Sequence, residues 1–287
     1  MPRQAYVNGR YLPHRQAAVH IEDRGYQFAD GVYEVIPVYN GILVDEDPHL
    51  DRLERSLREL RIAMPMGRAA LKMCARELIR RNDLTNGFIY MQVTRGVAAR
   101  DHRFPANAEP AVVMTTRQMR PHSEKLVSEG LKVITVPDIR WKRCDIKSVS
   151  LLPNVLAKQQ AAEAGAYEAW QVDEEGRVTE GSSTNAWIVT AEGKVVTREA
   201  THAILNGITR LSLIKLIEAE GHVLEERPFT VAEAKAAREA FLTSSTSFVL
   251  PVTQIDGTPV GNGHPGLLFG RIRELYINYV NSLGESA

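Results

Sequence analysis

The sequence of 287 residues has little cysteine and no net charge, and each absence excludes a class of protein. Cys74 and Cys144 are too few for a disulfide framework, and they lack metal-ligand spacing to each other or to a histidine. Lysine plus arginine and aspartate plus glutamate each number 35, so no overall charge attracts nucleic acid or an anionic membrane. Any anion-binding site must therefore be local.

Long apolar runs are also missing. No run approaches the roughly 20 residues that span a bilayer, and the start, MPRQAYVNGRYLPH, lacks the apolar centre of a secretory signal. We therefore expect a soluble, cytoplasmic protein. Because domains usually contain about 100–200 residues, we expect two, residues 1–119 and 120–287, joined by the polar segment Arg117–Glu124.

Patterns typical of helices and strands are mixed in both halves. Hairpins are predicted where alternating residues flank Asn-Gly or Asp-Gly, in AYVNGRYL, VYNGILV and TQIDGTPV. Helical patterns include DPHLDRLERSLRELRIA, with Asp47 as the expected cap, residues 67–81, and PNVLAKQQAAEAG, with Pro153 in its first turn. FIYMQVTR, AVVMTTRQ and LKVITVPDIRW indicate strands. Since strands and helices do not alternate regularly, the predicted fold class is α+β rather than a doubly wound sheet.

One segment concentrates positive charge. TRGVAARDHRFP, residues 94–105, directly follows the apolar run FIYMQV and contains three arginines and a histidine. Such a segment is either an ordinary solvated loop or a trap for an anion.

Three isolated charges are candidates for chemistry. Lys147, in CDIKSVSLLPN, is by position an exposed residue, but burial would lower the pKa of its amine and let it condense with carbonyl compounds. Glu180, in RVTEGSSTN, ends a predicted strand and either projects from the sheet edge into a pocket or lies in an exposed turn. Arg52 lies on a predicted helix, on a different face from the leucines Leu50 and Leu53, as a surface charge does.

Two further segments offer donors to a phosphate. In ILNGITRLSL a glycine precedes an apolar helix, which places the amides of Ile208 and Thr209 before the first intrahelical bond, at the positive end of the dipole. In LTSSTS the hydroxyl-rich run Thr243–Ser247 could add side-chain donors to the same anion, although a solvated strand end has the same pattern. Each signal alone is weak, because many helices begin after glycine and many strand ends carry serine.

Together these segments have a recognisable order. EDRGYQFADGVYEV, HLDRLERS, QVTRGVAARDH, DIRWKRCDIKS, VTEGSSTN, LNGITR and LTSSTS resemble the D-amino acid aminotransferases, a branch of the fold-type IV enzymes that use pyridoxal 5′-phosphate. The resemblance runs from Tyr6 to about Tyr279. It implies a two-domain mixed fold with the cofactor at the domain interface. It also implies ping-pong transamination between a D-amino acid of the D-alanine or D-glutamate class and a 2-oxo acid such as pyruvate or 2-oxoglutarate.

The resemblance assigns cofactor contacts to individual residues. Lys147, in the domain of residues 120–287, matches the catalytic lysine that forms the Schiff base with the cofactor and shuttles the proton. Glu180 matches the carboxylate paired with the pyridine nitrogen, which keeps the ring a strong electron sink. The groups that match the phosphate-binding set are the Arg52 side chain, the Ile208 and Thr209 amides, and a hydroxyl of Ser244 or Ser245.

Substrate contacts follow in the same way. Tyr33, Arg100 and His102 match the set that holds the substrate α-carboxylate, and in the family the Arg-x-His pair comes from the neighbouring subunit, so a homodimer is implied. Two departures from the family pattern lie near Tyr33. Ala29 stands where many relatives have glycine, and Pro37 interrupts EVIPVYN, so its strand is expected to be bulged or at an edge.

Other members of the same fold remain alternatives. Branched-chain L-amino acid aminotransferases, R-selective amine transaminases and aminodeoxychorismate lyase share the Lys147, Glu180 and phosphate-binding positions, and the pattern RGVAARDH favours the D-amino acid branch. A non-catalytic binding protein of this fold is a separate alternative. The presence of both Lys147 and Glu180 argues against it.

Overall fold

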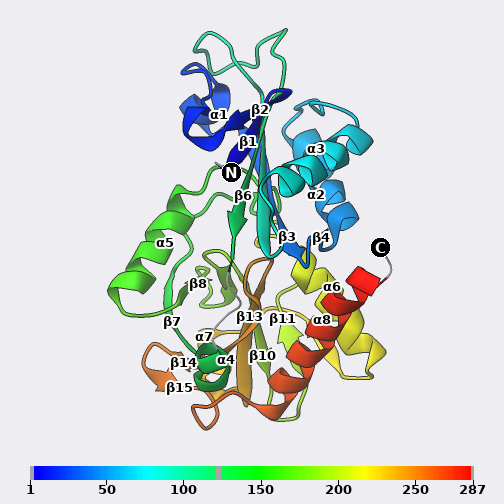
Figure 1. The fold of residues 1–287 in the computed structure, drawn as a ribbon. Coiled ribbons are helices and arrows are strands. Elements are labelled where there is room, and N and C mark those ends of the chain that lie inside the picture. Colours follow the sequence, from blue (N-terminus) through cyan, green and yellow to red (C-terminus); the bar gives the residue numbers. More distant parts are fainter. Residues whose placement is uncertain (1–2, 120–123, 286–287) are drawn as a thin grey trace. The chain divides into compact units, whose positions relative to one another are not determined.

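The computed structural model describes residues 3–119 and 124–285 and divides into two compact units. Unit 1 is Met1–Arg120 together with Ile146–Ser150, and unit 2 is Pro121–Asp145 together with Leu151–Ala287. Residues 120–123, within the expected linker, lie outside the described residues. Each unit combines helices with a mainly antiparallel sheet (Figure 1), so the predicted α+β class is confirmed.

Unit 1 contains a six-stranded antiparallel sheet with the order β2-β1-β6-β5-β3-β4. Asn8 and Asn40, each followed by glycine, have positive φ and form the two-residue turns of the predicted hairpins. The strands are β1 (Gln4–Val7), β2 (Arg10–Pro13), β3 (Gly31–Tyr39), β4 (Ile42–Leu43), β5 (Gly87–Thr94) and β6 (Ala111–Gln118).

Helices α2 (Glu46–Glu59) and α3 (Arg68–Arg81) lie beside the sheet of unit 1 (Figure 1). Their apolar stripes, spaced three and four residues apart, are buried with the sheet side chains in one core cluster. The prediction of Asp47 as the cap is wrong: helix α2 begins at Glu46, two residues earlier than that cap implies, and its N-cap is Asp45. Asp47 instead lies in the first turn, where its carboxylate pairs with Arg68 and Lys72.

The segment Ile146–Ser150 belongs to unit 1, which corrects the placement of Lys147 in the second domain. The Tyr33 amide donates to the Lys147 carbonyl at 3.0 Å, and the Val149 amide donates to the Gly31 carbonyl at 3.0 Å. Ile146 is buried in the core cluster of unit 1. Because the segment pairs with β3 after a separation of more than a hundred residues, a boundary drawn along the sequence could not find it.

Unit 2 contains a nine-stranded sheet with the order β12-β11-β10-β13-β14-β7-β8-β9, to which β15 adds beside β14. The pairs β11–β12, β14–β7 and β7–β8 are parallel, and the others are antiparallel. The strands are β7 (Leu131–Pro137), β8 (Glu168–Val172), β9 (Val178–Gly181), β10 (Asn185–Val189), β11 (Val195–Thr197), β12 (Leu224–Glu226), β13 (Glu239–Ser244), β14 (Phe248–Ile255) and β15 (Thr258–Pro259).

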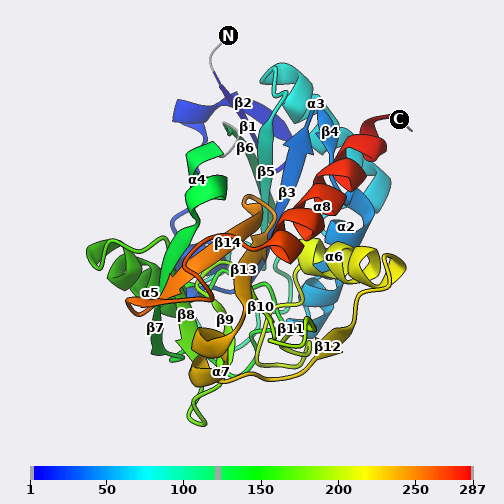
Figure 2. The ribbon, with the colours of Figure 1, turned by 90° about the horizontal axis from the view of Figure 1, so that it is seen from below.

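Helices α6 (Ile208–Ala219) and α8 (Leu267–Glu285) lie side by side in unit 2 (Figure 2). No described helix is long and apolar enough to cross a membrane. The remaining helices of this unit are α4 (Glu124–Glu129), α5 (Leu152–Glu163) and α7 (Val231–Ala236).

Pro37 lies within β3 opposite Phe88, and the register of β3 with β5 is unbroken there. The expected bulge is therefore absent from this pairing. The Pro37 carbonyl accepts from the Val44 amide at 2.9 Å on the opposite side of the strand. Since the nitrogen and carbonyl of a strand residue face the same way, the missing N–H is directed toward β4, which pairs over only two residues and ends the sheet.

Ala29 ends helix α1 (Arg24–Phe28) in the left-handed conformation, with φ 55°. A Cβ is unfavourable there, whereas glycine adopts this conformation freely. We predict that Ala29→Gly raises the free energy of unfolding by about 0.5–1 kcal/mol, the relief of strain exceeding the entropy that glycine adds to the unfolded chain. Urea unfolding measures the change. The control Ala70→Gly, at an exposed position in α3, should be destabilising by about the same amount.

Candidate functional site

Lys147 and Tyr33 are brought together in unit 1. The Lys147 Nζ lies 4.2 Å from the centroid of the Tyr33 ring, and the Lys147 amide donates to Ser56 Oγ of α2 at 3.4 Å. On the other side, the Tyr33 ring stacks on Tyr90 with centroids 5.6 Å apart, and the Tyr90 hydroxyl donates to Gln92. The face of an aromatic ring attracts an ammonium group. Burial raises the pKa of Tyr90 to about 12, so this phenol stays neutral.

Arg52 and His49 of α2 form a buried charged group with Glu34, which follows Tyr33 in β3. Its Nε and Nη2 each donate to the Glu34 carboxylate at 2.8 Å, and His49 Nδ1 lies 2.7 Å from the same carboxylate. Burial alone would raise the pKa of Glu34, but the charge and hydrogen bonds of Arg52 and the contact with His49 lower it to about 2. Burial lowers the pKa of His49. The bidentate pair fixes the direction of the guanidinium.

Glu180 is the centre of a second buried charged group, in unit 2. Arg140 Nη1 donates to one of its oxygens, and the Asn185 amide and the Leu205 backbone N–H donate at 3.1 Å. Arg140 also pairs with Asp138 at 2.6 Å. Burial alone would lower the pKa of Arg140, but Glu180 and Asp138 raise it above its ordinary value. Donors of this kind stabilise the carboxylate as an anion.

The phosphate candidates of unit 2 lie around Asn185. The helix α6 begins after Gly207, and its first backbone bond runs from Leu211 N to Gly207 O, so the Ile208 and Thr209 amides precede that bond. A Cβ at Gly207 would overlap Asn185 Oδ1. Asn185 in turn pairs in register with Thr243, one residue before the predicted serine donors.

The serine donors lie in a turn between β13 and β14. Ser244 Oγ accepts from the Ser247 amide at 3.0 Å and lies 3.4 Å from Thr246 Oγ1. Ser245 is half-buried in the same turn. The hydroxyls of Ser244 and Thr246, both within the predicted donor run Thr243–Ser247, therefore lie next to one another.

The structure divides the cationic segment into two kinds of residue. Arg95 is buried, donates to Asp30 and to the carbonyls of Leu60 and Arg61, and holds the segment to the sheet. Arg100 and His102 are exposed and lie beside Phe28 of α1 rather than beside Tyr33 and Lys147.

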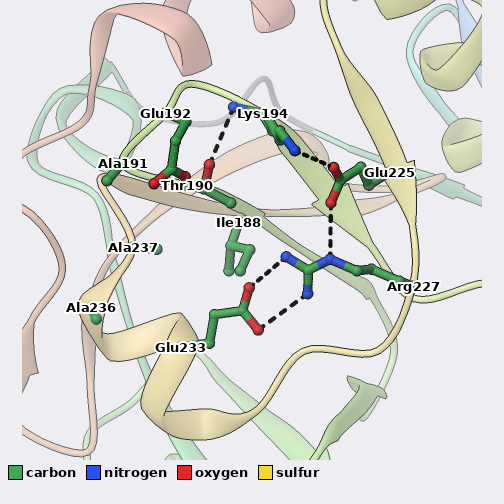
Figure 3. Close-up of a pocket in the computed structure, with 10 residues that line it drawn as sticks. All are labelled: Ile188, Thr190, Ala191, Glu192, Lys194, Glu225, Arg227, Glu233, Ala236 and Ala237. Carbon is green, nitrogen blue, oxygen red and sulfur yellow. Dashed lines mark hydrogen bonds and ion pairs between the residues drawn. The ribbon is translucent and has the colours of Figure 1, made fainter.

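A cavity of about 250 Å³ lies elsewhere in unit 2 and includes none of the predicted site residues. Four of its charged side chains form a connected series of ion pairs (Figure 3). Lys194 pairs with Glu225, and Arg227 pairs with Glu225 and Glu233. These groups neutralise each other at the surface, which is the ordinary role of such pairs.

Known proteins resemble the whole chain. The family model for amino-transferase class IV matches residues 31–255. The D-alanine aminotransferase of Bacillus licheniformis is 44% identical over 280 residues, 98% of this chain and 97% of the relative, and that of Staphylococcus aureus (strain COL) is 40% identical over 96% and 98%. The chain belongs to the class IV aminotransferases.

Among solved structures, the branched-chain aminotransferase of the archaeon Thermoproteus uzoniensis with norvaline has a TM-score of 0.86 at 25% identity. The match covers 96% of this chain and 94% of that chain. A branched-chain amino acid aminotransferase solved with pyridoxamine 5′-phosphate has a TM-score of 0.90 at 27% identity and covers 98% and 94%.

Class IV aminotransferases use pyridoxal 5′-phosphate, and the chemistry of the donor set in this class IV aminotransferase fits that cofactor. Unit 1 supplies a half-buried amine, Lys147, and a buried guanidinium, Arg52. Unit 2 supplies a buried carboxylate, Glu180, and a helix N-terminus opened by Gly207. An aldehyde, a phosphate and a protonated pyridine require groups of these kinds and charges.

Sequence reasoning missed the residues that orient this class IV aminotransferase site. Glu34 and His49 hold Arg52, and Arg140 and Asn185 hold Glu180. All four stand inside segments that carried the resemblance: Glu34 in GVYEV, His49 at the start of HLDRLERS, Arg140 in DIRW and Asn185 at the end of EGSSTN. For Glu34 and Asn185 the signal was a charged or amide residue within an otherwise apolar strand, because burial requires such a residue to be paired.

Glu34 makes stability depend on pH. Its pKa is lowered from 4.5 to about 2, so its contribution is complete above pH 4.5 and is lost as the pH falls toward 2, where the unfolded chain has already bound the proton. We predict that Glu34→Gln lowers the free energy of unfolding by about 3 kcal/mol at pH 7 and by much less at pH 2. Urea unfolding at several pH values measures both changes.

Glu77 provides the control for Glu34. Hydrogen bonds from Arg80 and Arg81 also lower the pKa of Glu77 to about 2, but this network lies at the solvent-facing surface of α3, where ion pairs contribute little. Glu77→Gln should leave the acid dependence almost unchanged. An equal effect of the two substitutions would refute the assignment of that dependence to the buried pair.

The position of Gly207 requires a residue without a side chain, because a Cβ there would overlap Asn185 Oδ1. A methyl group there would push Asn185 away from Glu180 and from the Leu205 carbonyl, to which Asn185 Nδ2 donates. Gly207→Ala should lower the free energy of unfolding by about 1–3 kcal/mol and reduce the cofactor retained after dialysis. Gly270→Ala is the control, because its Cβ would meet no atom within 4 Å and alanine favours the helix. Full retention by Gly207→Ala would contradict the crowding argument.

Proposed function

We propose that this class IV aminotransferase transfers the amino group of a D-amino acid of the D-alanine or D-glutamate class to a 2-oxo acid such as pyruvate or 2-oxoglutarate. The observation that carries the proposal is the full-length identity of 44% and 40% to D-alanine aminotransferases. The branched-chain enzyme that shares the fold is 27% identical, so the branched-chain alternative has less support.

The proposed chemistry assigns a task to each buried charge. When bound, the cofactor supplies an electron sink for the bond at the substrate α-carbon. Lys147 accepts the α-proton at Nζ and later returns it. The Tyr33 ring, 4.2 Å from that nitrogen, stabilises the ammonium formed between these transfers. Glu180 stabilises a proton on the pyridine nitrogen, and the donors around it keep it anionic.

Phosphate binding is proposed for groups of both units. Arg52 contributes a positive charge whose direction is set by Glu34. The Ile208 and Thr209 amides contribute donors at the start of α6, where the helix dipole also favours an anion. Ser244 or Ser245 adds a hydroxyl from the turn after β13. A phosphate dianion requires several donors of this kind.

Selection of the substrate is proposed for Arg100 and His102, which bind its α-carboxylate together with Tyr33. They act on the active site of the neighbouring subunit of a cytoplasmic homodimer. Their exposure in the single chain supports this role. So does an exposed apolar face of helix α5, because burial against a second copy would remove that face from water. It consists of Leu152, Val155 and Leu156, which are 69%, 58% and 46% exposed.

Two substitutions test the proposal. Lys147→Ala should abolish turnover of D-alanine with pyruvate. Arg100→Ala should raise the KM for D-alanine roughly tenfold to 150-fold, the loss of one charge-assisted hydrogen bond, and leave cofactor absorbance unchanged. L-alanine is the control substrate and should give no turnover. An unchanged KM for Arg100→Ala would remove this residue from substrate binding, and turnover of L-alanine would overturn the proposed enantiomer.

Mixing these two variants tests whether Arg100 acts across a dimer interface, when activity is assayed at a D-alanine concentration well below the raised KM of Arg100→Ala. A heterodimer of Lys147→Ala and Arg100→Ala subunits contains one site in which both residues are intact if Arg100 acts in trans. Random pairing should then restore roughly a quarter of wild-type activity. If Arg100 acts in its own subunit, both sites of the heterodimer are defective, and no activity returns beyond that of the Arg100→Ala enzyme.

A further inference from the structure

We propose that Phe28 is the positioning residue for the substrate-binding pair Arg100 and His102, a proposal that rests on the proposed function. The Arg100 Cζ lies 5.1 Å from the centroid of the Phe28 ring. The His102 ring lies 5.4 Å from the same centroid at an interplanar angle of 59°. The two side chains that select the substrate carboxylate thus converge on one aromatic ring.

The backbone of this segment is held independently of the Phe28 ring. Buried Arg24 donates from its amide to the Gly96 carbonyl at 2.9 Å and from Nη1 to the Asp101 carbonyl at 2.6 Å. Asp101 is the residue between Arg100 and His102, so the chain is fixed between the two. The Arg24 Nε is in turn held by Asp30 at 2.8 Å. Loss of the Phe28 ring therefore leaves the backbone path supported.

The exposed side chains need an orienting contact. Arg100 and His102 lie on the segment between β5 and β6, which loops out at the top of unit 1 in Figure 1. Because they are proposed to act in the neighbouring subunit, the cofactor-binding residues of their own subunit do not orient them. An arginine has many rotamers, and a ring that fixes one of them reduces the entropy lost when a carboxylate binds.

Phe28 supplies that contact from a rigid position. It is half-buried at the end of α1, whose N-cap Asp23 accepts from the Gly25 amide at 2.8 Å and from Thr94 Oγ1 at 2.9 Å. Its ring also contacts the Arg24 guanidinium, 4.7 Å from the centroid. A ring face attracts cations without neutralising them, so Arg100 keeps its charge for the substrate. A carboxylate in the place of Phe28 would compete with the substrate instead.

The test is steady-state kinetics of Phe28→Leu with D-alanine and pyruvate. Loss of the ring contact and of side-chain ordering should raise the KM for D-alanine roughly fivefold to thirtyfold. The kcat and the cofactor absorbance should stay near wild type. Phe28→Trp retains a ring face and should restore a KM close to wild type. Phe28→Met, of similar volume but without a ring, should behave as Phe28→Leu and replaces it if that variant fails to fold.

A matched control comes from the same helix. Tyr26 is 76% exposed, and Tyr26→Leu removes an aromatic ring from α1 without touching Arg100 or His102. Its KM should equal that of wild type. An equal rise in KM for Tyr26→Leu and Phe28→Leu would overturn the proposal, because the effect would then come from α1 as a whole. So would an unchanged KM in the Phe28→Leu and Phe28→Met variants.

A double-mutant cycle separates this proposal from the proposed function. In an enzyme that already carries Arg100→Ala and His102→Ala, Phe28→Leu should have almost no further effect on KM, because it acts through these side chains. A full further effect would overturn the proposal. If Arg100→Ala and His102→Ala themselves leave KM unchanged, the carboxylate-binding function fails. If they raise it and Phe28→Leu does not, only the role of Phe28 fails.

Discussion

Two backbone hydrogen bonds attach the segment Ile146–Ser150 to strand β3, and the position of the Lys147 amine depends on them. They join the Tyr33 amide to the Lys147 carbonyl and the Val149 amide to the Gly31 carbonyl. The same pairing places the Lys147 Nζ over the Tyr33 ring. Because Ile146 is also buried among the core side chains of unit 1, the lysine cannot move away without exposing an apolar residue. The position of the residue that we propose as the base is thus part of the stability of the sheet.

The charged candidate residues of each unit have buried partners. In unit 1 Arg52 is paired with Glu34, and in unit 2 Glu180 is paired with Arg140, which is itself paired with Asp138. A buried charge without such a partner carries a large desolvation cost. The tasks that we propose for Glu180 and Arg52, toward a pyridine nitrogen and a phosphate, therefore depend on these partners.

Sequence patterns predicted the local structure well, because that structure depends on neighbours in the chain. The three hairpins follow from Asn-Gly and Asp-Gly dipeptides, whose Asn and Asp residues adopt positive φ. The Asp47 cap failed because Asp45, with positive φ, starts the helix earlier. Sequence could not show that Lys147 joins β3 or that Glu34 reaches Arg52, since these contacts join residues that only the folded chain brings together.

The candidate site residues differ in how firmly they are held, and this difference matches their proposed tasks. Arg52 and Glu180 are buried in networks of charge-assisted bonds, which suits a cofactor that stays bound through many turnovers. Arg100 and His102 are exposed and rest against an aromatic ring, a contact weaker than an ion pair. Substrate and product must exchange twice in each ping-pong cycle, so firm ion pairs at the carboxylate-binding residues would compete with the ligand. An aromatic support orients the cations and leaves their charge to the substrate.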